Sequence, residues 1–158
     1  MEEITVQTKI NICQQAELTA DDQQLAQLAI ASADHAYAPY SRFHVGAAVR
    51  LANGVLLPGC NQENAAFTAG ICAERSAIFA AGAQYPDQPI TTIAIAAKDA
   101  NGMLTELPVS PCGTCRQVIV ETEKRFATTM RLILCGSSCV YVIEDGIRAL
   151  MPLSFSEF

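Results

Sequence analysis

The chain has 158 residues, 51% hydrophobic and 16% charged, so it can bury a sizeable core and is not intrinsically disordered. Sixteen acidic and ten basic residues give a net charge of −6 without a basic cluster, which argues against nucleic acid as a partner. No apolar run reaches the roughly 18 residues that span a bilayer, and the acidic, polar N-terminus is unlike a signal peptide. We therefore expect no membrane association and a cytoplasmic location. In that reducing compartment, the seven cysteines favour metal binding, catalysis or burial over disulfides.

Hydrophobic spacing and turn residues predict one domain, residues 1–158, in which strands and helices alternate after an opening hairpin. Thr19 is expected to cap the first helix, and Asn53-Gly54 is a two-residue hairpin turn. Gly82 and Pro86 are expected to end the second helix. The predicted elements, in chain order, are a short edge strand within 1–12, a helix over 19–36, strands over 43–52 and 55–59, a loop over 61–70, a helix over 72–83, a strand over 90–97, a helix over 112–125, strands over 130–135 and 140–143, and a short helix or turn over 147–158. This alternation predicts an α/β layered domain with a mixed sheet.

Three cysteines are spaced to bind one metal ion. Cys112 and Cys115 stand three residues apart at the predicted start of a helix, where both sulfurs face one side and the helix dipole favours thiolates. Cys72 begins the preceding helix, and it joins the other two if the two helix starts converge. Three protein ligands leave the fourth position of a zinc ion open, as in catalytic sites, whereas structural zinc sites close with four.

Glu74 follows Cys72 by two residues, so it can lie over the open position and transfer protons without binding the metal. Zinc deaminases have this pattern: a ligand before x-Glu, then Pro-Cys-x-x-Cys. Zinc with three thiolates carries a net negative charge, which a nearby cation should offset. Arg75 is the favoured candidate for this role, whereas Arg116 is equally open to a surface role.

Five segments match one family in order along most of the chain: YSRFHVGAA at 40–48, GCNQENA at 59–65, ICAERSA at 71–77, SPCGTCRQ at 110–117 and LMPLSF at 150–155. On these segments the chain resembles the small, homotetrameric, zinc-dependent cytidine deaminases of pyrimidine salvage. The resemblance implies a three-layer α/β/α fold with a mixed five-stranded sheet. It also implies hydrolytic deamination of cytidine and 2′-deoxycytidine to uridine and 2′-deoxyuridine plus ammonia, with a nucleoside as the small-molecule partner. About 15 residues at the N-terminus look like an addition to the family domain.

The resemblance also assigns roles to individual residues. Cys72, Cys112 and Cys115 would hold Zn²⁺, and Glu74 would transfer protons. The implied substrate contacts are Phe43 against the pyrimidine, Asn61 and Glu63 to the ribose hydroxyls, the Ala73 backbone to the base, and Ala65, Phe67 and Phe155 at sites shared across subunit interfaces. The family usually has tyrosine at the position of Phe67, so any contact of that hydroxyl is absent here.

The ribose assignment agrees with the chemistry of the two residues. Asn61 and Glu63 are two residues apart, so their side chains point the same way in an extended segment. An amide that donates and accepts, beside a carboxylate that accepts, suits a vicinal diol. A site built to bond hydroxyls strongly rejects ligands without them, so we expect a nucleoside as substrate and not a free base.

Three other interpretations remain open. A deaminase of the same fold acting on blasticidin S or another nucleoside analogue is disfavoured by the Asn61–Glu63 pair. A nucleic-acid-editing deaminase is disfavoured by the acidic charge and by cysteine as the first ligand. A non-catalytic zinc module would need a fourth protein ligand, which no residue offers at a suitable spacing.

Overall fold

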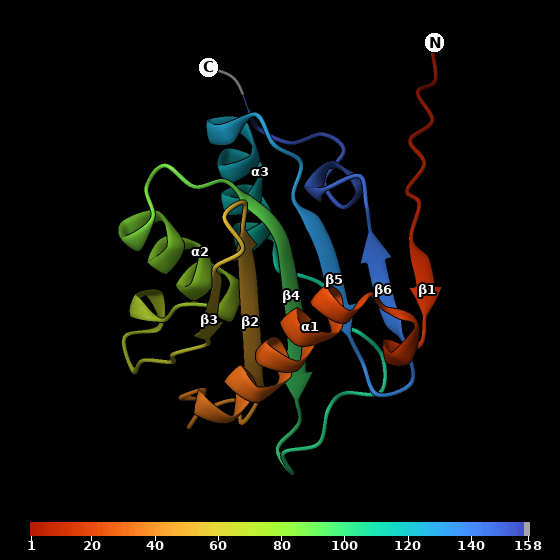
Figure 1. The fold of residues 1–158 in the computed structure, drawn as a ribbon. Coiled ribbons are helices and arrows are strands. Elements are labelled where there is room, and N and C mark those ends of the chain that lie inside the picture. The colour runs from red at the N-terminus through yellow and green to blue at the C-terminus, as the bar shows by residue number, and fades with distance from the viewer. Residues whose placement is uncertain (157–158) are drawn as a thin grey trace.

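One mixed sheet of six strands organises the computed structural model, which describes residues 1–156 (Figure 1). The strand order is β1-β6-β5-β4-β2-β3, in which only β4 and β5 are parallel neighbours. The strands are β1 (Asn11–Cys13), β2 (His44–Leu51), β3 (Leu56–Cys60), β4 (Ile90–Lys98), β5 (Arg131–Cys135) and β6 (Val140–Ile143). The expected count of five strands is therefore wrong by one. A short N-terminal edge strand forms as predicted, but only over Asn11–Cys13, so most of the predicted range, residues 1–10, lies outside it. It adds to the sheet because its backbone pairs with the otherwise open edge of β6.

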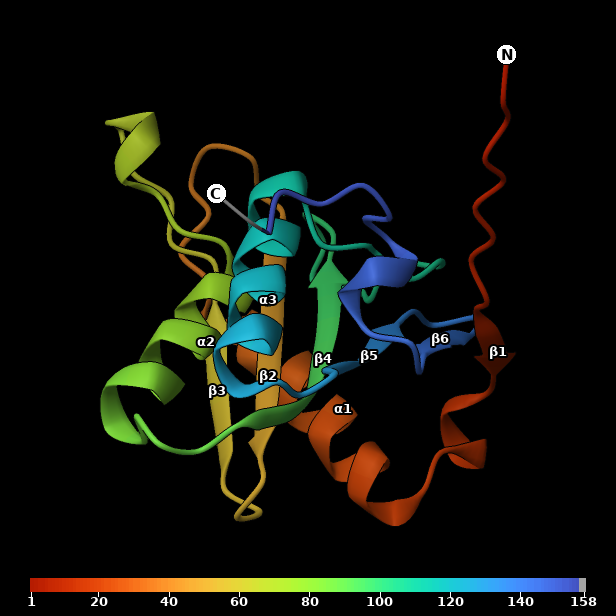
Figure 2. The same cartoon turned by 90° about the horizontal axis from the view of Figure 1, so that it is seen from above.

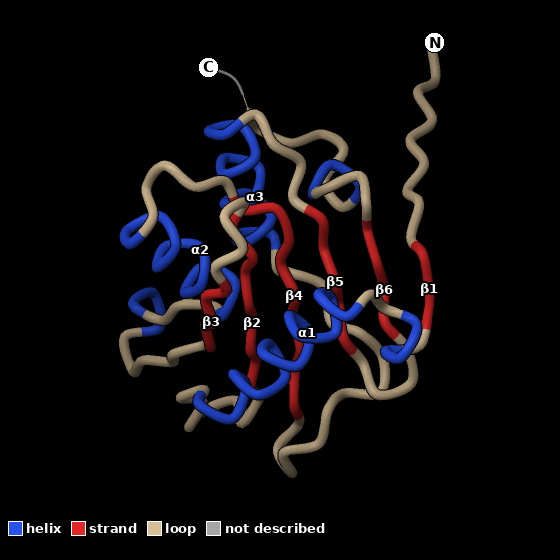
Figure 3. Tube along the Cα trace, viewed as in Figure 1, coloured by secondary structure: helices blue, strands red, loops and turns tan. Residues whose placement is uncertain are grey.

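Helices cover both faces of the sheet, which gives the expected α/β/α layers (Figures 1 and 2). Helix α1 (Ala20–Ser32) packs on one face, and helices α2 (Ala73–Gln84) and α3 (Gly113–Phe126) pack on the other. None of the helices in residues 1–156 is long and apolar enough to cross a membrane. Figure 3 shows that loops and short turns connect these elements, with residues 1–10 extended away from the layers.

The continuous apolar run of β4 reflects burial on both faces, as predicted. Ile93 and Ile95 pack with α2 and α3 in one core cluster, whereas Ala94 and Ala96 pack with α1 in the other. Because successive side chains of a strand point to opposite faces, a strand between two helical layers needs apolar residues at every position. Large residues face the two-helix layer, and alanines allow α1 to approach closely.

Most predicted helix boundaries agree with the structure to within a few residues. The Thr19 side chain accepts a hydrogen bond from the Asp22 amide at 3.2 Å, so the predicted cap is confirmed. The helix expected over 19–36 is shorter, since α1 ends at Ser32 and a single 3-10 turn, Ala33–His35, follows. The second helix ends at Gln84, one residue beyond the predicted end at 83 and two before Pro86, although Gly82 itself lies inside its last turn.

A single buried carboxylate ties α1 to two strands. Asp22 accepts hydrogen bonds from Arg50 of β2, at 3.2 Å, and from Arg131 of β5, at 2.5 Å. Burial by itself would raise the pKa of Asp22, but the hydrogen bonds and charge of Arg131, with help from Thr19 and Arg50, outweigh it and lower the pKa. Asp22 is therefore ionised in the folded chain at neutral pH and joins the first helix to the sheet.

The Asp22 pairings lead to a stability prediction. Asp22→Asn should lower the free energy of unfolding by about 2–3 kcal/mol at pH 7, because hydrogen bonds to a charged partner are lost. The lowered folded-state pKa means that this stabilisation is present above about pH 4 and disappears as the pH falls through that pKa. Urea denaturation of both proteins from pH 7 to pH 3 should show the difference shrinking in acid. Asp34→Asn, which breaks an exposed pairing with Lys98, is the control and should change stability little. Equal stability of Asp22→Asn and the wild type at pH 7 would contradict the role of Asp22.

Candidate metal and substrate site

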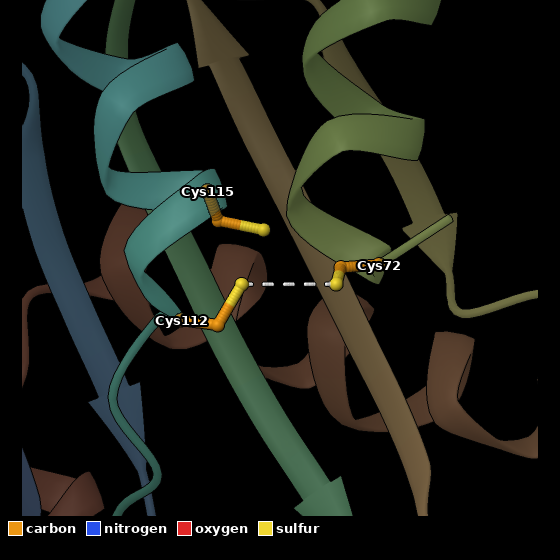
Figure 4. A group of neighbouring side chains, drawn as sticks. All are labelled: Cys72, Cys112 and Cys115. Atoms are coloured by element: carbon orange, nitrogen blue, oxygen red, sulfur yellow. Dashed lines mark hydrogen bonds between the residues drawn. The ribbon is translucent and has the colours of Figure 1, made fainter. Parts of the chain in front are cut away.

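Three cysteine sulfurs converge where α2 and α3 begin (Figure 4). Cys72 and Cys112 are the N-cap residues of the two helices, and Cys115 lies in the first turn of α3. The three Sγ atoms all lie within 4.8 Å of one another, and those of Cys72 and Cys112 are 3.9 Å apart. Neither N-cap side chain bonds its own helix backbone, so both sulfurs are available to an ion between the helices.

Close packing of α2 on β3 helps to fix the position of the first helix start. Gly59 of β3 lies under the first turns of α2, where a Cβ atom would come within 2.6 Å of the Ala73 carbonyl oxygen and 2.5 Å of the Ala77 nitrogen. Because only glycine permits this approach, the strand and the helix share a tight contact. This contact fixes the position of the first turn of α2, which carries Glu74 and follows Cys72.

The electrostatics of the cluster favour a bound cation. A hydrogen bond from Cys115 is the largest influence on Cys72, and with Arg75 and Cys112 it lowers the pKa of the Cys72 thiol to about 5 despite burial. Facing that thiolate, and itself buried, Cys115 has its pKa raised. The cluster therefore stabilises one negative charge readily and opposes further charge until a cation arrives. Among residues 1–156 the group contains three ligands, which fits a zinc ion with one open position.

Of the two arginines considered as counter-charges, one contacts the sulfurs. The Arg75 Nη2 atom lies 3.5 Å from the Cys72 sulfur, and this thiolate is the main reason that the pKa of Arg75 is raised. Arg116 instead donates to the backbone carbonyls of Pro111 and Leu150. Arg75 is therefore the arginine that is placed to offset the thiolate charge. Arg116 fits neither of the two roles considered for it, because its side chain is hydrogen-bonded to backbone carbonyls and not to a sulfur.

Glu74 is a buried carboxyl beside the cluster. Its side chain is 4% exposed and lines the cavity that the cysteines border. Burial is the main cause that raises the pKa of Glu74, and the negative charge of Cys72 adds to it. A carboxyl whose pKa is moved toward neutrality suits repeated proton uptake and release.

The cavity measures about 610 Å³, within the usual range for small-molecule sites. The expected site residues that line it are Phe43, Asn61, Glu63, Phe67, Cys72, Glu74, Arg75 and Cys112. Its apolar walls also include residues that we did not predict: Val45, Ile71, Ile95 and Val109. Val45 and Ile71 stand inside the motif segments, which is a usable signal, whereas Ile95 and Val109 reach the cavity only through the arrangement of the sheet and the loop before α3.

The two expected ribose ligands are already engaged with the backbone. Asn61 accepts from the Val45 amide at 2.7 Å and donates to the Phe43 carbonyl at 3.0 Å. One Glu63 oxygen, Oε2, accepts from the amides of Tyr40, at 2.9 Å, and of Ser41, at 3.3 Å. The pKa of Glu63 is lowered chiefly by its side-chain hydrogen bond with Ser41. Each side chain therefore braces the segment that carries Phe43 while keeping hydrogen-bonding capacity for a ligand.

Three expected substrate residues do not line the cavity of their own chain. Ala65 is exposed in the loop after β3, and Ala73 is buried against the core. Phe155 is 64% exposed and lies in the C-terminal segment, where its carbonyl accepts a hydrogen bond from Gln117. Phe67, at the rim of the cavity, is 94% exposed. Phe67 therefore lines the cavity with most of its surface still exposed, whereas Phe155 is exposed away from it.

Comparisons with known proteins agree on one family. Residues 19–130 match the family described as the cytidine and deoxycytidylate deaminase zinc-binding region. A cytidine deaminase from Halalkalibacterium halodurans is 43% identical over 101 residues, which span 64% of this chain and 71% of the relative. One from Sporosarcina psychrophila is 42% identical over 124 residues, spanning 78% and 83% of the two chains. The crystal structure of cytidine deaminase from Burkholderia pseudomallei matches with a TM-score of 0.72 and 37% identity, covering 87% of this chain and 100% of that one.

The family match spans both helix starts and all three cysteines of the cluster. It therefore accounts for the same residues that the geometry brings together as a three-sulfur site beside a buried glutamate. The chain belongs to the zinc-binding cytidine and deoxycytidylate deaminase family.

Proposed function

We propose that the chain hydrolyses cytidine and 2′-deoxycytidine to uridine and 2′-deoxyuridine plus ammonia, as a zinc enzyme of pyrimidine salvage. In this reaction a C4–O bond forms with water and the C4–N bond to the amino group breaks. The observation that supports it most is the convergence of three cysteine sulfurs, two of which, Cys72 and Cys112, line a cavity of about 610 Å³ together with buried Glu74. The names of the relatives, all cytidine deaminases, support the choice of substrate.

The chain's own residues divide the chemistry between them. Zinc held by Cys72, Cys112 and Cys115 would supply Lewis acidity to a water nucleophile. Glu74 would accept a first proton from that water and deliver it to N3 of the pyrimidine, where it stays in the product. It would then carry the second proton, from the new C4 hydroxyl, to the amino group that leaves as ammonia. Burial excludes bulk water from Glu74, so the proton stays between the carboxyl and the substrate.

Substrate recognition would fall to the opposite wall of the cavity. Phe43, which lines the cavity, would pack against the pyrimidine. The Ala73 backbone, expected to contact the base, lies beside Cys72 and does not line the cavity. The second N–H of the Asn61 amide and the remaining lone pairs of the Glu63 carboxylate would serve the ribose hydroxyls, since their other bonds go to the backbone and to Ser41. Because both side chains are braced before substrate arrives, little ordering is required on binding.

We further propose a homotetramer in the cytoplasm, with active sites completed at subunit interfaces. Three exposed residues support shared sites: Ala65 and Phe67 in the loop after β3, and Phe155 in the C-terminal segment. A reducing compartment would keep the seven free cysteines, and the zinc-binding thiols among them, from oxidation. The net charge of −6 supports a nucleoside rather than a nucleic-acid substrate.

Glu74→Gln tests the reaction and the proton carrier together. Purified wild-type protein should release ammonia from cytidine, and the variant should lose about 10²–10⁴-fold in kcat because the amide cannot transfer the proton. Zinc content, measured by atomic absorption, should be equal in the two proteins, since Glu74 is not a ligand. No release by folded, zinc-loaded wild type from cytidine or 2′-deoxycytidine would overturn the proposed function, and nucleoside analogues such as blasticidin S would then be the substrates to assay.

Glu63→Gln tests recognition of the ribose. The amide keeps an acceptor oxygen for the Tyr40 and Ser41 amides but is a weaker acceptor for a hydroxyl, so kcat/KM for cytidine should fall by about 10–100-fold. Activity on the free base cytosine, however low, should change far less. Exposed Glu106, changed to glutamine, is the control and should leave both values unchanged. Equal losses on cytidine and cytosine would exclude a contact between Glu63 and the sugar.

Subunit mixing tests the shared sites. Glu74→Gln protomers keep Phe155 and Phe155→Ala protomers keep Glu74, so mixed assemblies should recover activity that neither variant has alone. Mixing Phe155→Ala with the double variant Glu74→Gln/Phe155→Ala should recover none. Sedimentation equilibrium should give a mass of four chains. A monomeric mass, or the absence of complementation in tetramers shown to exchange subunits, would contradict the interface proposal.

A further inference from the structure

Arg116 holds both peptide groups that flank Cys112. Its backbone N–H donates to the Cys112 carbonyl at 2.9 Å, in the first turn of α3. Its side-chain Nε donates to the Pro111 carbonyl at 2.8 Å. The orientation of the peptides on either side of a Cα atom sets the direction of its Cβ atom. Arg116 therefore acts on the direction in which the Cys112 sulfur points.

The peptide before Cys112 has few other restraints. Pro111 has no N–H, so its carbonyl is the only backbone group of that residue that can be hydrogen-bonded. Pro111 is buried, and a buried carbonyl without a donor would be costly. Cys112 is itself exposed and, as an N-cap, makes no side-chain bond to its helix. Of the three cluster cysteines, it is the one least restrained by packing.

The other end of the guanidinium reaches the C-terminal segment. Arg116 Nη1 donates to the Leu150 carbonyl at 2.6 Å, across 34 positions of sequence. Further along α3, Gln117 donates to the Phe155 carbonyl at 2.7 Å and Lys124 donates to the Ser156 carbonyl. The segment from 150 to 156 thus runs along α3, and Arg116 joins it to the loop before Cys112. The planar fork of arginine can serve two carbonyls at once, which a lysine ammonium on a flexible stem does less well.

A charge-balancing role does not explain this geometry. Arg75 approaches the Cys72 sulfur at 3.5 Å, whereas the Arg116 side chain donates to the carbonyl oxygens of Pro111 and Leu150. These are directional bonds between a donor fork and two backbone acceptors. They constrain position, and they would do so in the same way if the cluster were neutral.

We propose that Arg116 is a positioning residue of the zinc site, which holds the Cys112 ligand in place by clamping its preceding peptide to the C-terminal segment. Partners of this kind around metal ligands contribute about 10–100-fold to metal affinity or activity. The inference rests on the zinc site of the proposed function but not on its substrate. Loss of the clamp should therefore appear first as faster release of zinc.

The test compares three variants of the full-length, zinc-loaded protein. Arg116→Gln removes the fork, and Arg116→Lys keeps the positive charge without the two-carbonyl geometry. Arg125→Gln is the matched control, because Arg125 lies on the same helix and also donates to a proline carbonyl, that of Pro86, at 2.8 Å, away from the cysteines. Zinc release to a chromogenic chelator at neutral pH is the main measurement. Absorption of the cobalt-substituted proteins reports the ligand geometry independently of activity.

The expected result is zinc release at least tenfold faster in Arg116→Gln, also clearly faster in Arg116→Lys, and unchanged in Arg125→Gln. The cobalt spectrum should shift in both Arg116 variants and not in the control. Wild-type release and spectrum in folded Arg116→Gln would overturn the proposal. If Arg116→Gln does not fold, Arg116→Lys decides: faster zinc loss supports the clamp, and wild-type zinc retention shows that charge alone suffices and overturns it. Because these measurements need no substrate, an enzyme inactive on cytidine would refute the proposed function and leave this result standing.

Discussion

The convergence of two helix N-termini on one point is the constraint on which the rest of the site depends. Cys72 and Cys112 are each the residue before the first helical turn, so the positive ends of both helix dipoles point toward the sulfurs. A shift of either helix by one residue would rotate its ligand by about 100° and disperse the cluster. The sheet prevents such shifts, since β3 packs through Gly59 against α2, and parallel β4 and β5 flank the connection that contains α3.

Burial and charge then follow from the same placement. Because Glu74 and Cys72 share the first turn of the α2 region, the carboxyl lies within the field of the thiolate and away from water. Arg75, the next residue, turns its guanidinium to the sulfur and balances it. Positions 72, 74 and 75 therefore bring together a thiolate, a buried carboxyl and a guanidinium, the groups to which the proposed function gives the roles of metal ligand, proton carrier and counter-charge. Because these groups are close in sequence as well as in space, the short segment that contains them was enough to predict the site.

The parts of the structure that depend on neighbours in sequence were predictable, and those that depend on distant packing were not. The Thr19 cap and the two-sided burial of β4 follow from local propensity and periodicity. A turn also forms at Asn53-Gly54, but the connection between β2 and β3 spans residues 52–55 and is not the expected two-residue hairpin turn. The cysteine spacing predicted a three-sulfur site, given convergence of the helices, but convergence itself is a property of the sheet. Arg116 contacts Leu150, and Ile95 lines the cavity, only because the fold brings together residues that are far apart in sequence. Local sequence patterns do not predict such contacts.

The bracing of Asn61 bears on how this site can evolve. Its amide holds the start of β2 at Val45 and the carbonyl of Phe43, and it also faces the cavity. A substitution that altered preference for the sugar would at the same time loosen the strand that presents the aromatic wall. Glu63 is engaged in a similar way, since its Oε2 atom accepts from the Tyr40 and Ser41 amides and its carboxylate also hydrogen-bonds with the Ser41 side chain. If both residues bind the ribose as proposed, a change of sugar preference at either position would therefore also loosen the segment that presents Phe43.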